Sequence, residues 1–77
     1  MFETLLFFST LEDVKKFVDF ALSKECEMEL ISGKYVINAK SIMGVFSLDL
    51  TEPIKLVAHC GEDLTENLTE FLYHEEI

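Results

Sequence analysis

The chain begins with an apolar run that is followed by a helical pattern of apolar residues. The run from Thr4 to Phe8 has the Phe and Leu content of a buried strand. Ser9 and Thr10 follow it, and Glu12 lies three residues after Ser9, which is the spacing of a capping box at a helix start. Behind this start, apolar residues recur at helical spacing, at Leu11, Val14, Phe17, Val18, Ala21 and Leu22.

The next segment predicts a β-hairpin. Between residues 25 and 31, glutamates alternate with apolar side chains, which is the period of a half-buried strand. Ser32-Gly33 is a two-residue connection of the kind that joins hairpin strands, and it would place Leu30 opposite Tyr35. This register is self-consistent because it also pairs the other inward positions, Met28 with Ile37 and Cys26 with Ala39.

Three further elements follow. Ser41 is a good N-cap for a short helix over residues 42–46, which Gly44 weakens. Beyond Pro53 an extended segment carries Ile54, Leu56, Ala58 and Cys60 on one face. After Gly61, a final amphipathic helix with an acidic first turn is predicted from Leu64, Leu68, Phe71 and Leu72.

This order of elements favours an α+β fold in a single domain over residues 1–77. Strands are few, and the helices are long enough to cover one face of one sheet, which makes a two-layer sandwich the simplest arrangement. The length of 77 residues allows one hydrophobic core.

Charge narrows the range of partners. Fifteen acidic residues face six lysines and no arginine, for a net charge of −9. Nucleic-acid binding needs clustered Lys and Arg, so it is excluded, and an anionic membrane surface and tight capture of a free anion are disfavoured for the same reason. No apolar run approaches the roughly 20 residues of a membrane span, and no secretory signal is recognised.

The Cys and His residues indicate no metal, cofactor or catalytic site. Cys26, Cys60, His59 and His74 lack metal-ligand spacing, and neither histidine belongs to a nucleophilic arrangement. We expect His59 on the outer face of the sheet. Both cysteines are predicted to point inward as free thiols of a cytoplasmic protein.

One stretch resembles a known family. The eleven residues Asn38-Ala39-Lys40-Ser41-Ile42-Met43-Gly44-Val45-Phe46-Ser47-Leu48 are similar to the regulatory-serine segment of the histidine-containing phosphocarrier protein (HPr) family of the bacterial sugar phosphotransferase system. The resemblance implies an open-faced sandwich, with a four-stranded antiparallel sheet and three helices on one face. In such a sheet the strands that carry Cys26 and Cys60 are antiparallel neighbours, which leaves a redox pair as an alternative to two free thiols.

The resemblance also implies that the phosphoryl relay is missing. Counted back from Ser41 without gaps, the family's phosphohistidine position falls on Thr10, its arginine position on Glu12 and its proline position on Asp13. A helix N-terminus attracts phosphate through free N–H groups and the helix dipole, but two carboxylates already stand at this one. The chain is therefore expected to be a member that lacks the phosphoacceptor histidine and is not an enzyme.

The matching serine suggests regulation. In many HPr-like proteins a dedicated kinase phosphorylates this serine, and the position falls on Ser41. Ile42, Met43 and Phe46 match the apolar patch through which the family meets its partners. The simpler interpretation is that Ser41 is only a helix cap and that Met43 and Phe46 belong to the core.

Two functions are therefore expected from different classes. The first is a non-catalytic HPr-family protein that docks a protein partner through the Ser41–Phe46 surface, under Ser41 phosphorylation. The alternative is a small-molecule-sensing or structural α/β sandwich, similar to the ACT-like modules and unrelated to phosphotransfer. It predicts paired subunits with the ligand at their interface.

Overall fold

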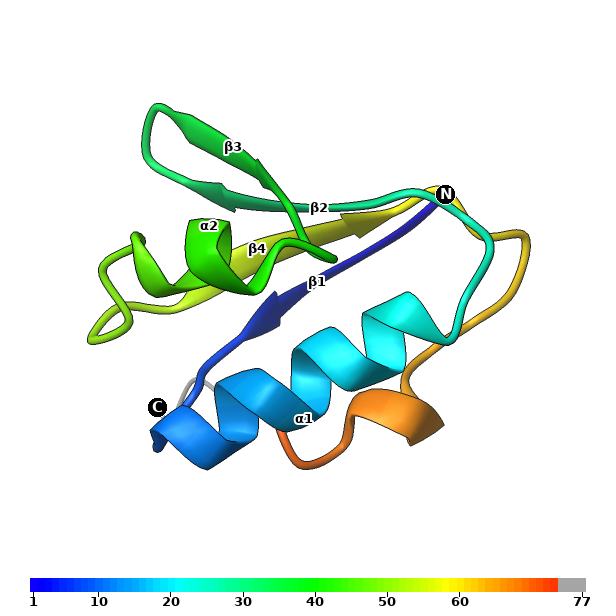
Figure 1. Ribbon diagram of the computed structural model, residues 1–77. Coiled ribbons are helices and arrows are strands. Elements are labelled where there is room, and N and C mark those ends of the chain that lie inside the picture. The colour runs from blue at the N-terminus through cyan, green and yellow to red at the C-terminus, as the bar shows by residue number, and fades with distance from the viewer. Residues whose placement is uncertain (74–77) are drawn as a thin grey trace.

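Four antiparallel strands form one sheet, and the helices pack on one of its faces (Figure 1). The structure is a computed structural model that describes residues 1–73. Along this part of the chain the elements are β1 (Phe2–Leu6), α1 (Leu11–Leu22), β2 (Met28–Ser32), β3 (Tyr35–Asn38), α2 (Ile42–Phe46), β4 (Ile54–Ala58) and the 3-10 helix η1 (Glu66–Leu68). The strand order is β1-β4-β2-β3. The α+β class and the antiparallel sheet agree with the prediction.

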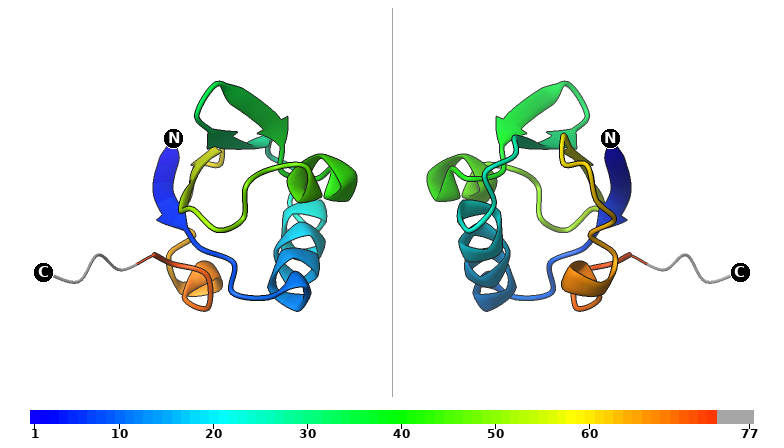
Figure 2. Two further views of the ribbon diagram at one scale, coloured as in Figure 1. Left: turned by 90° about the vertical axis from the view of Figure 1, so that its left-hand side faces the viewer. Right: turned by 90° about the vertical axis from the view of Figure 1, so that its right-hand side faces the viewer.

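The core lies between the sheet and the helices. In Figure 2 the strands follow the top and one side of the molecule, α1 and α2 lie on the opposite side, and η1 lies below β1. From β4, the side chains of Ile54, Leu56 and Ala58 are fully buried, as their shared face predicts. They meet the buried face of α1, which consists of Val14, Phe17, Val18 and Ala21.

Helix α1 has the predicted span, but its capping residue and the exposure of its first and last residues differ from the prediction. Its N-cap is Thr10, one residue later than the predicted box, because the Asp13 backbone N–H donates to Thr10 Oγ1 (3.2 Å). The Asp13 carboxylate in turn accepts from the Ser9 backbone N–H (3.1 Å). Leu11 and Leu22 are exposed although they fit the apolar spacing, since the apolar stripe is longer than the core that it covers.

The predicted bounds of β1, residues 4–8, are wrong: the strand lies two residues earlier in the chain. The chain leaves the sheet after Leu6, where the Phe7 backbone N–H donates to the Phe71 carbonyl (2.7 Å). Phe8 then turns into the core against the rings of Phe17 and Phe71, at centroid distances of 5.3 and 5.8 Å. The end of the apolar run therefore serves the helical layer and not the strand.

The hairpin forms with a register shifted from the predicted one. Gly33 and Lys34 form the turn, so Leu30 lies opposite Ile37, and Ser32 opposite Tyr35. Gly33 has a φ of +59°, a conformation that glycine adopts freely at the first central position of a tight hairpin turn. Because the shift changes the partners by two residues, every side chain keeps its predicted face, but Tyr35 moves to the exposed end of the strand.

The predicted C-terminal helix is wrong in the described residues. Only η1 forms, with Leu64 and Leu68 buried and no side-chain hydrogen bond at its N-cap, Thr65. The Thr and Asn residues of this segment favour helix weakly. The chain then runs to the edge of β1, where Leu72 bridges Leu6 and the Tyr73 backbone N–H donates to the Leu5 carbonyl (2.9 Å). His74 and the rest of the predicted helix lie outside the described residues.

The other face of the sheet carries paired polar side chains. His59 lies there, as predicted, with Nε2 at 3.0 Å from Glu29 Oε1. The Lys55 ammonium donates to Glu3 (2.8 Å) and lowers the pKa of that carboxyl. Within residues 1–73, none of the helices has the length and apolarity to cross a membrane.

Candidate functional site

The region that resembles the regulatory segment forms a strand end, a cap and a short helix. The Ser41 backbone N–H donates to the Asn38 carbonyl (3.0 Å), which turns the chain out of β3. Ser41 Oγ accepts from the Gly44 backbone N–H (3.3 Å), and the Ser41 carbonyl accepts from Val45 (2.9 Å). The predicted N-cap is therefore confirmed, and the capping serine is exposed.

Gly44 allows α2 to lie directly on β3. A Cβ atom at this position would stand 2.7 Å from Ile37 Cγ2 and 3.1 Å from Ser41 Oγ, well inside van der Waals contact. The sequence pattern shows only that glycine weakens the helix, whereas the structure gives its purpose. With the glycine side against β3, Val45 enters the core.

The opposite side of α2 presents apolar side chains to solvent. Met43 is 76% exposed and Ile42 is 36% exposed. Phe46 is half-buried and packs against the core. We call Ser41, Ile42, Met43 and Phe46 the α2 surface. Met43 is therefore open to solvent, while Phe46 contributes mainly to packing, and docking through these residues stays a prediction.

Lys40, the cation next to Ser41, is engaged elsewhere. Its Nζ donates to the Lys24 carbonyl (2.7 Å), just beyond the C-terminus of α1. A positive charge at this end of a helix interacts favourably with the helix dipole. The Lys40 backbone N–H donates to Asn38 Oδ1 (2.9 Å). Because the Lys40 ammonium is bonded to the Lys24 carbonyl, it is not positioned to pair with a phosphate on Ser41.

The start of α1 is occupied by the protein's own groups. Thr10 Oγ1 is used as an acceptor, and the Asp13 carboxylate holds the Ser9 N–H. Glu12 adds a second carboxylate in the first turn. The structure thus brings Thr10, Glu12 and Asp13 together as one acidic helix cap.

A shallow groove that the sequence did not reveal lies beside this cap. It has a volume of about 330 Å³ and runs between the start of α1 and the loop after α2, lined by Phe8, Ser9, Thr10, Leu11, Leu50 and Thr51. Leu11 is 63% exposed at its rim. The spacing of Leu11 assigned it to the core face, and no local signal distinguishes it from the buried members of that face.

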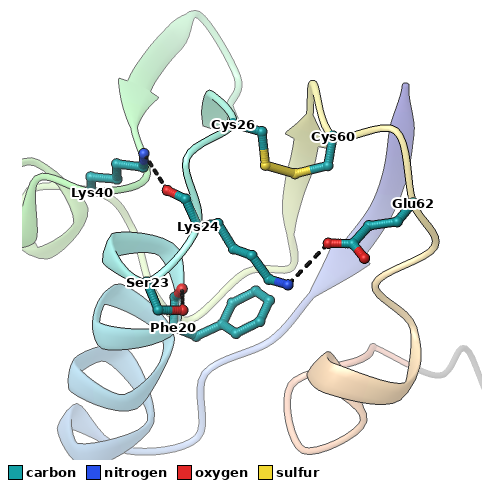
Figure 3. Close-up of a disulfide and its surroundings, with 7 residues drawn as sticks. All are labelled: Phe20, Ser23, Lys24, Cys26, Lys40, Cys60 and Glu62. Atoms are coloured by element: carbon teal, nitrogen blue, oxygen red, sulfur yellow. Dashed lines mark hydrogen bonds and ion pairs between the residues drawn. A yellow bond between two sulfur atoms is a disulfide. The ribbon is translucent and has the colours of Figure 1, made fainter.

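The two cysteines form a disulfide, which overturns the expectation of two free thiols (Figure 3). The Cα atoms of Cys26 and Cys60 are 5.2 Å apart. The cause is the β2–β4 register, in which Met28 lies opposite Ala58, so that the positions two residues outward also face each other. The His59 N–H extends this ladder by donating to the Glu27 carbonyl (2.8 Å).

Comparison with known proteins adds no named relative. No protein-family model, curated protein or solved structure matches the chain. Within residues 1–73, no three His, Cys, Asp or Glu side chains gather into a metal-binding group. Function is therefore inferred from the α2 surface and from the occupied start of α1.

Proposed function

We propose that the protein is a non-catalytic relative of the HPr family that docks a protein partner of the bacterial sugar phosphotransferase system through the α2 surface. The observation that carries the proposal is the exposed side of α2, where Met43 and Ile42 face solvent beside the capping Ser41. Methionine adapts to different partners, and exposed apolar side chains that cluster on one element are typical of binding surfaces.

The architecture supports this proposal. The four-stranded antiparallel sheet, with its helices on one face, has the form that the resemblance implies. Ser41 caps α2 in the stretch that carries the resemblance. The third helix that the resemblance implies does not form in the described residues, where only the short η1 is present.

The start of α1 supports a role without phosphotransfer. Thr10 stands at the phosphohistidine position and offers a hydroxyl, whose phosphoester would be too stable for rapid onward transfer. The neighbouring carboxylates of Glu12 and Asp13 would repel a phosphoryl group, and Asp13 already uses a backbone donor.

The charge of the chain defines the partner further. A net charge of −9 attracts a basic surface and accelerates encounter with it. Since Lys40 is bonded to the Lys24 carbonyl, a phosphate on Ser41 would be paired by Arg or Lys side chains of the partner. Phosphorylation would then strengthen docking by adding charge that only the partner neutralises.

The regulatory part is tested with a serine-specific HPr kinase and ATP, followed by intact-mass measurement. We expect one added phosphate on the wild-type protein and none on Ser41→Ala. Ser47→Ala is the matched control, because Ser47 is also exposed and lies just past the same helix, with its hydroxyl bonded to the Gly44 carbonyl. No phosphate on the wild type, or a phosphate that survives Ser41→Ala, contradicts this part.

The docking part is tested by binding to purified phosphotransferase-system and catabolite-regulatory proteins. Met43→Asp should abolish binding, whereas Leu5→Asp should not, since Leu5 is also apolar and exposed but lies on β1, at the opposite edge of the sheet from β3 and α2. A protein that instead forms dimers, is stabilised by a small molecule and is indifferent to Met43→Asp belongs to the ACT-like alternative.

A further inference from the structure

Two distant segments are joined twice at one end of the sheet. The disulfide links Cys26 to Cys60, and two residues from each cysteine Lys24 Nζ lies 2.9 Å from Glu62 Oε1 (Figure 3). The same ammonium group lies 5.7 Å from the centroid of the Phe20 ring. The ion pair is partly exposed, and such pairs contribute little by themselves. The covalent bond is therefore the main tie between residues 24–26 and 60–62.

The segment around Cys26 also bonds to the two residues that precede the N-cap of α2. The Lys40 ammonium donates to the Lys24 carbonyl (2.7 Å), and the Ala39 backbone N–H donates to the Met28 carbonyl (3.0 Å). Lys40 immediately precedes Ser41, the N-cap of α2. A path of direct bonds thus runs from the disulfide through Lys24 and Lys40 to the helix that carries the α2 surface.

The two halves of the disulfide differ in access. Cys60 is 6% exposed and lies two residues beyond the end of β4, whereas Cys26 is half-buried in the connection before β2. A thiolate from solvent meets Cys26 more readily, because thiol–disulfide exchange requires direct approach to the attacked sulfur.

We propose that the Cys26–Cys60 disulfide is a reversible redox modification site, opened by a dithiol reductant at Cys26, and that its opening loosens α2. One thiolate of the reductant attacks Cys26 Sγ, which forms a mixed disulfide and releases the Cys60 thiolate, and that thiolate takes up a proton. The second thiol of the reductant then displaces the Cys26 thiolate, which is protonated in turn. Two electrons and two protons pass to the protein, and the reductant leaves as its own disulfide.

The chemistry is tested by alkylation with iodoacetamide without denaturant. The untreated protein should gain no label, and the protein treated with dithiothreitol should gain two. In single variants, Cys26 of Cys60→Ser should react about tenfold faster than Cys60 of Cys26→Ser, because burial slows the reaction of a thiol. A disulfide that dithiothreitol opens only in denaturant, or equal rates for the two thiols, overturns the site.

The coupling is tested by amide hydrogen exchange at the two helix starts. The Val45 amide, bonded to the Ser41 carbonyl, reports on α2, and the Val14 amide, bonded to the Thr10 carbonyl, is the matched reference on α1. On reduction, the ratio of the Val45 rate to the Val14 rate should rise at least about threefold, because local opening of α2 adds to global opening. An unchanged ratio overturns the coupling.

A variant tests the path itself. Lys40→Met keeps the aliphatic stem and removes the bond to the Lys24 carbonyl, so the rate ratio should already be raised in the oxidised protein and change little on reduction. Lys34→Met, in the exposed hairpin turn, should respond as the wild type does. An equal response in both variants overturns the path. Neither assay uses a partner or a kinase, so failure here leaves the proposed docking intact, and failed docking leaves this site intact.

Discussion

The start of α1 and the start of α2 each carry an exposed hydroxyl that accepts a hydrogen bond from the backbone N–H three residues ahead, Thr10 from Asp13 and Ser41 from Gly44. Their surroundings differ. At α1 the first turn carries, after the exposed Leu11, the carboxylates of Glu12 and Asp13, which repel an anion. At α2 the next side chains are Ile42 and Met43, which face solvent without charge.

The difference shows how one local motif supports two roles. The cap of α1 serves a helix of 12 residues with a broad buried face, so it stabilises the fold. The cap of α2 serves a helix of five residues that has only Val45 fully buried, so it holds a small apolar surface in place. The start of α1 thus serves the fold, whereas Ser41 at the start of α2 is exposed beside apolar side chains.

Loss of the disulfide should give the largest effect, and one that falls more on α2 than on α1. The bond closes a sequence separation of 34 residues, so the double variant Cys26→Ala/Cys60→Ala should lower the free energy of unfolding by about 4 kcal/mol. Urea denaturation followed by circular dichroism measures this. A change below about 1 kcal/mol would show that the two ends of the loop are held equally well without the bond.

Gly44→Ala should come next, because it removes the close contact that distinguishes α2. The added Cβ would meet Ile37 Cγ2 at 2.7 Å. Overpacking costs about 1–3 kcal/mol, and the gain in helix propensity returns about 1 kcal/mol, which leaves a net loss of about 0–2 kcal/mol. Lys15→Ala on the exposed side of α1 is the control and should change the unfolding free energy by less than about 0.5 kcal/mol. A stabilised Gly44→Ala protein would contradict the packing of α2 on β3.

The two caps can be compared directly. Thr10→Ala should lower the unfolding free energy by about 1 kcal/mol, and Ser41→Ala by about 0.5 kcal/mol, because the second cap supports a shorter helix with fewer buried residues. Chemical denaturation of both variants in one buffer measures the difference. A larger loss for Ser41→Ala would reverse the structural and exposed roles assigned to the two positions.

The smallest effect concerns the start of η1, where the Thr65 hydroxyl donates to a carboxylate and does not cap the helix. Before η1, the Thr65 hydroxyl and backbone N–H donate to Asp63 and lower the pKa of its carboxyl below the ordinary 3.8. The stabilisation is therefore complete above pH 3.8 and is lost as the pH falls through the lower folded value. Thr65→Val should be less stable than the wild type at pH 7, and the difference should shrink in acid. A difference that grows in acid would contradict the lowered pKa.

Local signals predicted much of the fold. The apolar spacing behind Thr10 gives the span of α1, and the serine before an apolar turn gives the cap of α2. The shared face of Ile54, Leu56 and Ala58 gives β4. Each of these features depends on residues within a few positions of one another, where propensity and periodicity act directly.

The errors arose where distant segments decide. Leu72 belongs to an apolar helical pattern, yet it pairs with Leu6 at the edge of the sheet, and that partner is 66 positions away in the sequence (72 − 6). The disulfide depends on β2 and β4 being neighbours, which no spacing between the two cysteines expresses. The residues of the α2 surface were identified from the sequence. The exposure of Leu11, by contrast, depends on how far the core extends under α1, and local spacing does not express it.

The bridge between Leu6 and Leu72 has a consequence for self-association. An outermost strand with free N–H and C=O groups can template the addition of another chain, which begins aggregation. The C-terminal segment covers the carboxyl end of β1 through this bridge and the Tyr73–Leu5 bond. At the opposite border β3 is only four residues long and follows the exposed Lys34, both of which discourage such growth. The C-terminal segment therefore protects the β1 edge of the sheet, whereas the short length of β3 and the charge of Lys34 protect the other edge.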